Sequence, residues 1–159
     1  MRPLFRRVSV IFLALAGLYG GAALAQAEVE TPYWASLKSD KANARVGPAT
    51  DFQIAWVYQR KNLPVKVVKR YGPWRKIEDP DGTQSWMYTT LLTRVRTAIV
   101  IDDIQEMRAG PSAQTKLLWR AEPGVVGKLG ECENGYCEFD VTGRVGYVKI
   151  EGLWGAGEP

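Results

Sequence analysis

The sequence reads Arg45-Val46-Gly47-Pro48 and, further along the chain, Arg108-Ala109-Gly110-Pro111. The offset in numbering is 63 for this motif and for Trp56 with Trp119, 62 for Trp74 with Tyr136 and Ile77 with Phe139, and 61 for Gly82 with Gly143 and Leu92 with Leu153. An offset that changes in steps of one is what small differences in loop length produce between two copies of one unit. The sequence therefore predicts an internal duplication, with roughly 60 residues in each copy.

Both copies have the pattern of β-structure. Segments such as residues 63–69 and 146–150 are short, alternating or β-branched, and are bounded by Gly, Pro, Asn and Asp. No helical period persists after Ala27. We therefore expect an all-β protein of two small barrels in tandem, with five or so strands each. We place the first barrel at residues 33–96 and the second at 97–155, and so short a connection favours barrels that touch.

Several motifs resemble the bacterial SH3-like domain family. They are Asn43-Ala44-Arg45-Val46-Gly47-Pro48, Gly72-Pro73-Trp74, Asp81-Gly82 and Trp86-Met87 in the first copy, and Arg108-Ala109-Gly110-Pro111, Glu122-Pro123-Gly124-Val125 and Leu153-Trp154-Gly155 in the second. The resemblance covers roughly residues 33–155 and is to the exported two-copy SH3-like proteins of Gram-negative bacteria. It implies small barrels used for binding, often of cell-wall material. A late Gly-Trp pair typical of the family is Ser85-Trp86 in one copy and Gly146-Tyr147 in the other, which argues against two identical sites.

The segment 1–27 has the order of a secretory signal peptide. A basic start containing Arg2, Arg6 and Arg7 leads into an apolar stretch over residues 8–24, and two overlapping small-x-small cleavage sites follow, at 23–25 and 25–27. The alternative is a retained membrane anchor, but glycines shorten the apolar run relative to the span of about 20 residues that a bilayer needs. We expect a periplasmic or secreted protein with no stable membrane anchor after cleavage.

The formal charge of +4 comes mostly from this leader. Cleavage after Ala27 would leave 18 basic and 17 acidic residues. These are unevenly divided, because residues 33–96 contain 12 basic and 5 acidic residues, whereas residues 97–159 contain 6 and 10. The sequence therefore predicts a basic first barrel and an acidic second one.

The chain contains no histidine and only two cysteines. Histidine-dependent nucleophiles, histidine general bases and most zinc sites are thereby excluded. A pair of carboxylates could still catalyse hydrolysis, but Asp79 and Asp81 lie in an Asp-Pro-Asp-Gly run that first indicates a hairpin turn. We expect no enzyme activity, no cofactor and no metal.

The two cysteines flank the sequence Glu133-Asn134-Gly135-Tyr136. Asn-Gly is favoured at the centre of a two-residue type I′ hairpin, which would place Cys132 opposite Cys137 at a distance suited to a disulfide. Such a bridge contributes about 2 kcal/mol in the chain-entropy model. The alternative, a redox-active pair, normally has two intervening residues and lies at the start of a helix. We expect a structural disulfide.

A candidate ligand surface lies on the first barrel. Strand alternation places Ile77 and Met87 inward and predicts that Trp74, Trp86 and Tyr88 point outward, as Tyr136 does in the second copy. Arg75 and Lys76 lie beside Trp74, so an acidic or sugar-peptide ligand is physically reasonable here. The alternative is that the opposite charges dock the barrels together and bury these aromatic side chains in the contact.

These observations lead to a non-enzymatic exported binding protein. The first hypothesis is recognition of peptidoglycan peptide or glycan through Trp74, Trp86, Tyr88, Arg75 and Lys76. The second is a periplasmic adaptor or assembly protein that binds another envelope protein. Aromatic and basic residues together also describe a platform for single-stranded nucleic acid, but an exported protein is not expected to meet that partner.

Overall fold

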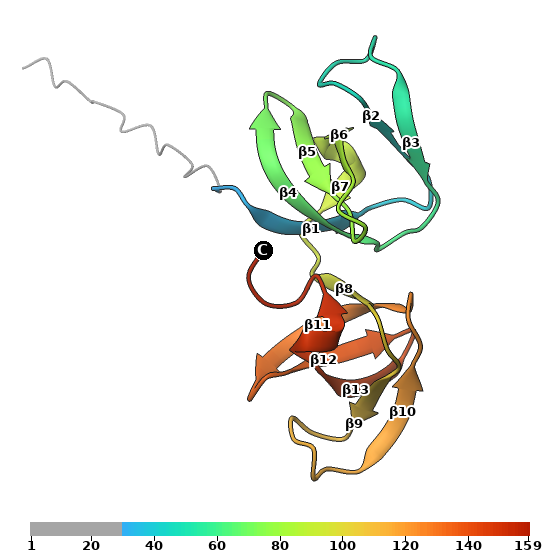
Figure 1. Cartoon of the computed structure of the whole chain (residues 1–159), viewed down its shortest axis with the longest axis vertical. Coiled ribbons are helices and arrows are strands. Elements are labelled where there is room, and N and C mark those ends of the chain that lie inside the picture. The colour runs from blue at the N-terminus through green and yellow to red at the C-terminus, as the bar shows by residue number, and fades with distance from the viewer. Residues whose placement is uncertain (1–29) are drawn as a thin grey trace, which may run out of the picture.

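The computed structural model describes residues 30–159, and it folds into two β-barrels with almost no helix (Figure 1). The expected signal peptide at residues 1–27 lies outside the described residues. No described helix is long and apolar enough to cross a membrane.

The first barrel is a seven-stranded antiparallel sheet with strand order β3-β2-β6-β5-β4-β1-β7. Its elements are β1 (Tyr33–Leu37), β2 (Ala42–Arg45), β3 (Ile54–Tyr58), β4 (Pro64–Tyr71), β5 (Trp74–Glu78), β6 (Gln84–Tyr88), the 3-10 turn η1 (Thr89–Leu91) and β7 (Leu92–Thr93). Consecutive strands β4, β5 and β6 pair as a meander. The β2–β3 hairpin extends the sheet beyond them (Figure 1).

The second barrel repeats this topology, since its strand order is β10-β9-β13-β12-β11-β8-β14. Its elements are β8 (Thr97–Val100), β9 (Gln105–Arg108), β10 (Leu117–Ala121), β11 (Val126–Glu133), β12 (Tyr136–Val141), β13 (Arg144–Lys149), the 3-10 turn η2 (Ile150–Gly152) and β14 (Leu153–Trp154). The number of each strand in this order equals the number of its counterpart in the first barrel plus seven, so the predicted duplication is confirmed. There are seven strands per barrel rather than five or so, and the last of each, β7 and β14, has only two residues and follows the 3-10 turn.

Each barrel has its own hydrophobic core. The first core contains Ile77 and Met87, both fully buried, as strand alternation predicted. The second contains Cys137, Phe139 and Val148, also fully buried. Because apolar residues cluster separately in the two halves, each copy buries its own inward faces.

The two cysteines form the predicted disulfide across the β11–β12 hairpin. Cys132 pairs directly with Cys137 in the ladder, and their Cα atoms are 4.0 Å apart. Both turn residues have positive φ, 50° at Asn134 and 77° at Gly135, as a type I′ turn requires. The Asn-Gly pair thus sets the register that brings the sulfur atoms together.

Reduction of this disulfide is expected to lower the free energy of unfolding of the second barrel by about 2 kcal/mol, because it closes a short loop of the unfolded chain. Thermal scans with and without reductant measure the change, and a Cys132→Ser/Cys137→Ser double variant should match the reduced protein. Ligand binding by the first barrel should persist. Loss of that binding at unchanged stability would contradict a purely structural bridge.

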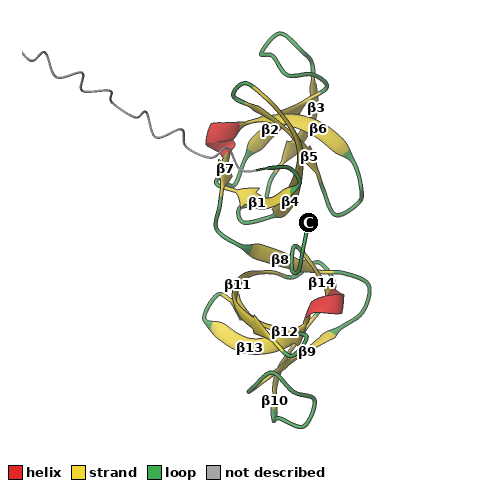
Figure 2. Cartoon of the chain, turned by 90° about the vertical axis from the view of Figure 1, so that its left-hand side faces the viewer, coloured by secondary structure: helices red, strands yellow, loops and turns green. Residues whose placement is uncertain are grey.

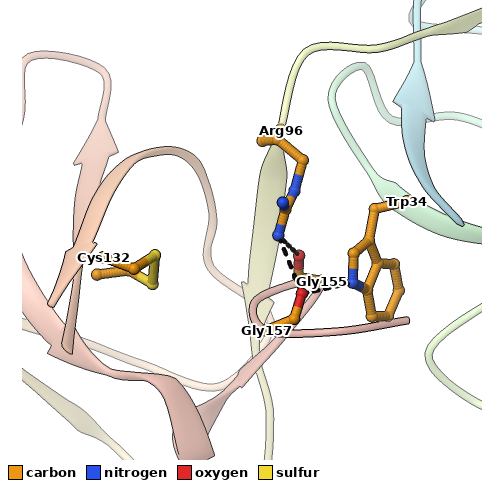
Figure 3. The surroundings of a disulfide bond; sticks show 6 residues. Trp34, Arg96, Cys132, Gly155 and Gly157 are labelled. Carbon is orange, nitrogen blue, oxygen red and sulfur yellow. Dashed lines mark hydrogen bonds between the residues drawn. A yellow bond between two sulfur atoms is a disulfide. The ribbon is translucent and has the colours of Figure 1, made fainter. Parts of the chain in front are cut away.

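The barrels touch through a small contact between β1 of one and β14 of the other, together with the segment that follows β14 (Figure 2). The rings of Trp34 and Trp154 meet edge to face, with centroids 4.8 Å apart, and Trp34 Nε1 donates a hydrogen bond of 3.1 Å to the carbonyl of Gly157. Arg96 reaches the same segment from the other side and donates to the carbonyl of Gly155 at 3.0 Å (Figure 3). A Cβ atom at Gly155 would lie 2.5 Å from the carbonyl oxygen of Thr97, so glycine permits this close approach.

The expected docking of the two barrels by opposite charges is not seen at their contact. The ion pair Lys66–Glu78 lies within the first barrel and the ion pair Arg108–Glu106 lies within the second, so neither of them joins the two barrels. Trp34 and Trp154 make the contact instead, and the candidate aromatic residues on β5 and β6 take no part in it. The alternative that this contact buries those residues is therefore wrong.

Candidate ligand-binding surface of the first barrel

Four of the five predicted site residues lie on the outer face of β5 and β6. In the ladder Trp74 is opposite Tyr88, and Lys76 is opposite Trp86. These side chains alternate with inward-facing residues of the same strands, such as Ile77 and Met87. The sequence pattern therefore assigned them to the correct face of the sheet.

The prediction that Trp74 is an accessible surface residue is wrong. Its side chain is only 8% exposed, and its ring meets the ring of Tyr88 edge to face at 5.3 Å. Trp74 directly follows the turn of the β4–β5 hairpin, and the ring of Tyr88, its partner in the β5–β6 ladder, packs against it. The equivalent Tyr136 is also 8% exposed, so the second copy repeats this burial. Of the three predicted aromatic residues, two remain accessible: Trp86, which is half-buried, and Tyr88, which is 37% exposed.

Arg75 does not belong to this face. It alternates with Trp74 and Lys76 and points to the other side of β5. Its Nε donates to the hydroxyl of Tyr33 at 3.2 Å, and its Nη1 donates to the carbonyls of Gly72 and Trp74. The predicted group of five residues is thus divided between two surfaces.

A compact polar cluster continues the outer face beyond Lys76. Lys66 Nζ lies 2.6 Å from Glu78 Oε1, and Gln84 Nε2 donates to Glu78 Oε2 at 2.8 Å. These two donors hold the pKa of Glu78 below its usual range. The carboxylate is already satisfied, which leaves Lys76 as the cation next to Trp86.

The Asp79-Pro80-Asp81-Gly82 run forms the predicted turn, and Asp79 holds it together. Its Oδ1 accepts hydrogen bonds from the backbone N–H groups of Asp81, at 3.1 Å, and Thr83, at 2.9 Å. Its Oδ2 accepts a bond of 2.9 Å from the hydroxyl of Tyr58. Burial, together with this carboxylate, raises the pKa of Tyr58 well above its usual value. Asp79 thus has a structural role in joining the turn to β3.

Sequence reasoning missed the most exposed tryptophan among the described residues. Trp56, on β3, is 61% exposed and lines a cavity of about 330 Å³ together with Tyr58, Leu63, Asp79, Pro80, Asp81 and Thr83. In the second barrel the guanidinium of Arg144 lies 5.4 Å from the ring centre of the equivalent Trp119. Thr83 occupies the position of Arg144 in the first copy, by the same offset that relates Gly82 to Gly143. The replacement of arginine by threonine at this position indicates, from the sequence alone, that no guanidinium covers the indole ring of Trp56 as Arg144 covers that of Trp119.

Within residues 30–159, no group of three or more acidic or cysteine side chains is arranged to hold a metal ion. The outer face of β5 and β6 has the rings of Trp86 and Tyr88 beside the amino group of Lys76. Such groups bind sugars, peptides and anions without forming covalent bonds.

The model of the bacterial SH3 domain matches residues 38–93 and again residues 102–155. Solved structures similar to this chain include NlpC2 from Trichomonas vaginalis, with 10% identity and a TM-score of 0.36 over 80% of this chain and 49% of that one. NlpC1 from the same organism has 11% identity and a TM-score of 0.36 over 81% and 48%. The chain therefore spans about half the length of these proteins. No curated protein matches it.

Proposed function

Because the chain belongs to the bacterial SH3 domain family, we propose that it is an exported, non-enzymatic protein that binds the peptide or glycan of peptidoglycan through its first barrel. The supporting observation is the juxtaposition of half-buried Trp86 with Lys76 on the outer face of β5 and β6, with exposed Tyr88 on the same face. Aromatic rings beside an amino group suit a ligand that has both flat apolar surfaces and acidic groups. The basic residues concentrated in the first barrel add long-range attraction to such a ligand.

Sedimentation with isolated sacculi tests this proposal. We expect the protein to pellet with sacculi at low salt and the bound fraction to fall as salt rises, because the attraction is partly electrostatic. Trp86→Ala should weaken binding about tenfold, the loss expected on truncating an interface tryptophan. The variant Trp74→Ala is unsuitable, since Trp74 is buried and its loss would disturb folding.

Tyr147→Ala is the matched control. Tyr147 holds the position of Trp86 in the second copy, by the offset that also relates Gly82 to Gly143. Its replacement should leave binding within about twofold of the wild type. Absence of pelleting at every salt concentration would reject peptidoglycan as the ligand. Equal losses in both variants would reject the assignment to the first barrel.

A second candidate is an adaptor that binds another envelope protein, and the edge strand β3 favours it. This strand ends the sheet, and Ile54 and Trp56 on it are 46% and 61% exposed. An exposed apolar edge can accept a strand from a partner. A photo-crosslinker at Ile54 should then capture one envelope protein in a 1:1 ratio without sacculi, whereas one at Leu118 on the edge strand β10 should not.

A further inference from the structure

The cavity beside Trp56 differs in charge from the rest of the first barrel. Among the described residues that line it, Asp79 and Asp81 are acidic and none is basic. Residues 33–96 as a whole contain 12 basic and only 5 acidic residues. Burial and the hydrogen bond to Asp79 raise the pKa of Tyr58, and the charge of Asp81 raises it further. The cavity therefore combines aromatic walls with negative charge on a barrel that is basic overall.

The second barrel shows which group fits against this tryptophan. Trp119 is equivalent to Trp56, because each is the third residue of an edge strand and pairs with the equivalent position of the neighbouring strand. The guanidinium of Arg144 lies 5.4 Å from the ring centre of Trp119, within the range of a cation–π interaction. Trp119 is 46% exposed, against 61% for Trp56. One copy of the fold thus already places a guanidinium group against this indole ring.

Two positions beside the cavity differ in charge between the copies. At the offset of 61, Asp81 corresponds to Thr142, and Thr83 corresponds to Arg144. The second copy has a cation and no acid at these positions, whereas the first has an acid and no cation. Asp81 is exposed, and no hydrogen bond or ion pair of its carboxylate is found within residues 30–159. The first copy is therefore complementary to a cation that its own chain does not supply.

We propose that this cavity binds an arginine side chain from an extended segment of a partner protein. The flat guanidinium can lie against the indole ring while its N–H groups donate to the carboxylate of Asp81. A volume of 330 Å³ equals that of about eleven water molecules, which is room for a guanidinium and its methylene stem but not for a folded element.

The position of the cavity favours a partner segment over a free small molecule. The outer edge of β3 has no paired strand within residues 30–159, so an added strand can pair there. Its nearest side chain would lie about 5 Å from that of Trp56, as cross-strand neighbours do. The proposal rests on the second candidate function, binding of an envelope protein, and names the side chain that would be recognised. It does not depend on peptidoglycan binding.

Titration with N-acetyl-glycyl-arginyl-glycinamide, followed by NMR of the indole N–H groups, tests the site. We expect a saturable shift of the Trp56 signal with a dissociation constant of roughly 1–10 mM, the weak affinity of a single side chain. The same peptide with citrulline in place of arginine keeps the shape without the charge and should bind about tenfold more weakly. The Trp119 signal should not shift, because Arg144 already occupies that ring. Equal binding of the two peptides, or an equal shift of both signals, would overturn the site.

Two variants of the first barrel test the groups that would hold the guanidinium. Asp81→Asn should weaken binding of the arginine peptide about threefold, the loss expected for an exposed ion pair. Asp51→Asn is the matched control, because Asp51 is exposed and does not line the cavity. Thr83→Arg restores the residue type of the second copy and should reduce binding about tenfold, because its own guanidinium then covers the ring. Equal losses in Asp81→Asn and Asp51→Asn, or full binding by Thr83→Arg, would contradict the proposal.

The outcomes separate this inference from the proposed functions. Capture of an envelope protein by the crosslinker at Ile54 without arginine binding would reject the cavity alone. Arginine binding by a protein that captures no partner would support the cavity and reject the adaptor function. A dimer of this chain that dissociates in Thr83→Arg would show that a second copy occupies the cavity and would overturn the assignment to a separate partner. Sacculus binding should be unchanged in Thr83→Arg, since Thr83 lies outside the pair of Trp86 and Lys76.

Discussion

Replacing Asp79 by alanine is expected to lower the free energy of unfolding of the first barrel by about 4 kcal/mol. Asp79 is 8% exposed and accepts hydrogen bonds from Tyr58, Asp81 and Thr83, so its loss leaves three donors near the turn without their acceptor. For a domain of this size the midpoint of thermal unfolding should fall by roughly 20 °C. Circular dichroism or calorimetry measures the change.

Asp79→Asn is the matched control, because its amide can accept from both backbone groups and donate to the hydroxyl of Tyr58. We expect it to retain most of the stability. Tyrosine absorbance, followed as the pH rises, gives a second readout, because it reports the ionisation of the Tyr58 hydroxyl. Since the pKa of Tyr58 is raised, the stability it contributes is complete below pH 10, about the value in the unfolded chain, and is lost as pH rises above it. Asp79→Ala should weaken this alkaline loss, and an unchanged alkaline profile would show that the carboxylate does not contact Tyr58.

Replacing Trp34 by alanine is expected to separate the barrels. The variant loses the ring contact with Trp154 and the hydrogen bond to Gly157, together with half-buried apolar area, for a cost of about 3 kcal/mol in the contact between barrels. Trypsin cleavage in the Arg94–Arg96 connection should accelerate by about two orders of magnitude, because Arg96 is held by the same segment. Mass spectrometry of the cleaved halves measures this rate.

Trp34→Phe isolates the hydrogen bond, because phenylalanine keeps an edge-to-face ring but has no N–H. Its cleavage rate should fall between those of the wild type and Trp34→Ala. Each barrel should keep its own midpoint of unfolding in all three proteins, since the two cores are separate. Equal cleavage rates in all three would mean that Trp34 does not hold the barrels together.

The duplication and the β-hairpins could be predicted because both depend on local patterns. The nearly constant offset between equivalent motifs predicted one topology in two copies, and Asn134-Gly135 predicted the turn that pairs Cys132 with Cys137. The alternation of β5 and β6 likewise predicted that Ile77 and Met87 point into the core. Period and turn chemistry are properties of a few neighbouring residues, which the sequence shows directly.

Exposure and long-range contacts could not be predicted in the same way. Alternation tells which face Trp74 occupies but not that the ring of Tyr88 packs against it. The contact of Trp34 with Trp154 joins residues near opposite ends of the described chain, and no local pattern indicates it. Charge counts suggested electrostatic docking, whereas the contact depends on two indole rings and a few backbone carbonyls.

The disulfide makes the two barrels respond differently to the redox state of their surroundings. The second barrel is bridged at Cys132–Cys137, whereas the first contains no cysteine. A change to reducing conditions would therefore weaken the second barrel and leave the stability of the first unchanged. The duplicated fold thus contains one copy that senses thiol chemistry and one copy that does not.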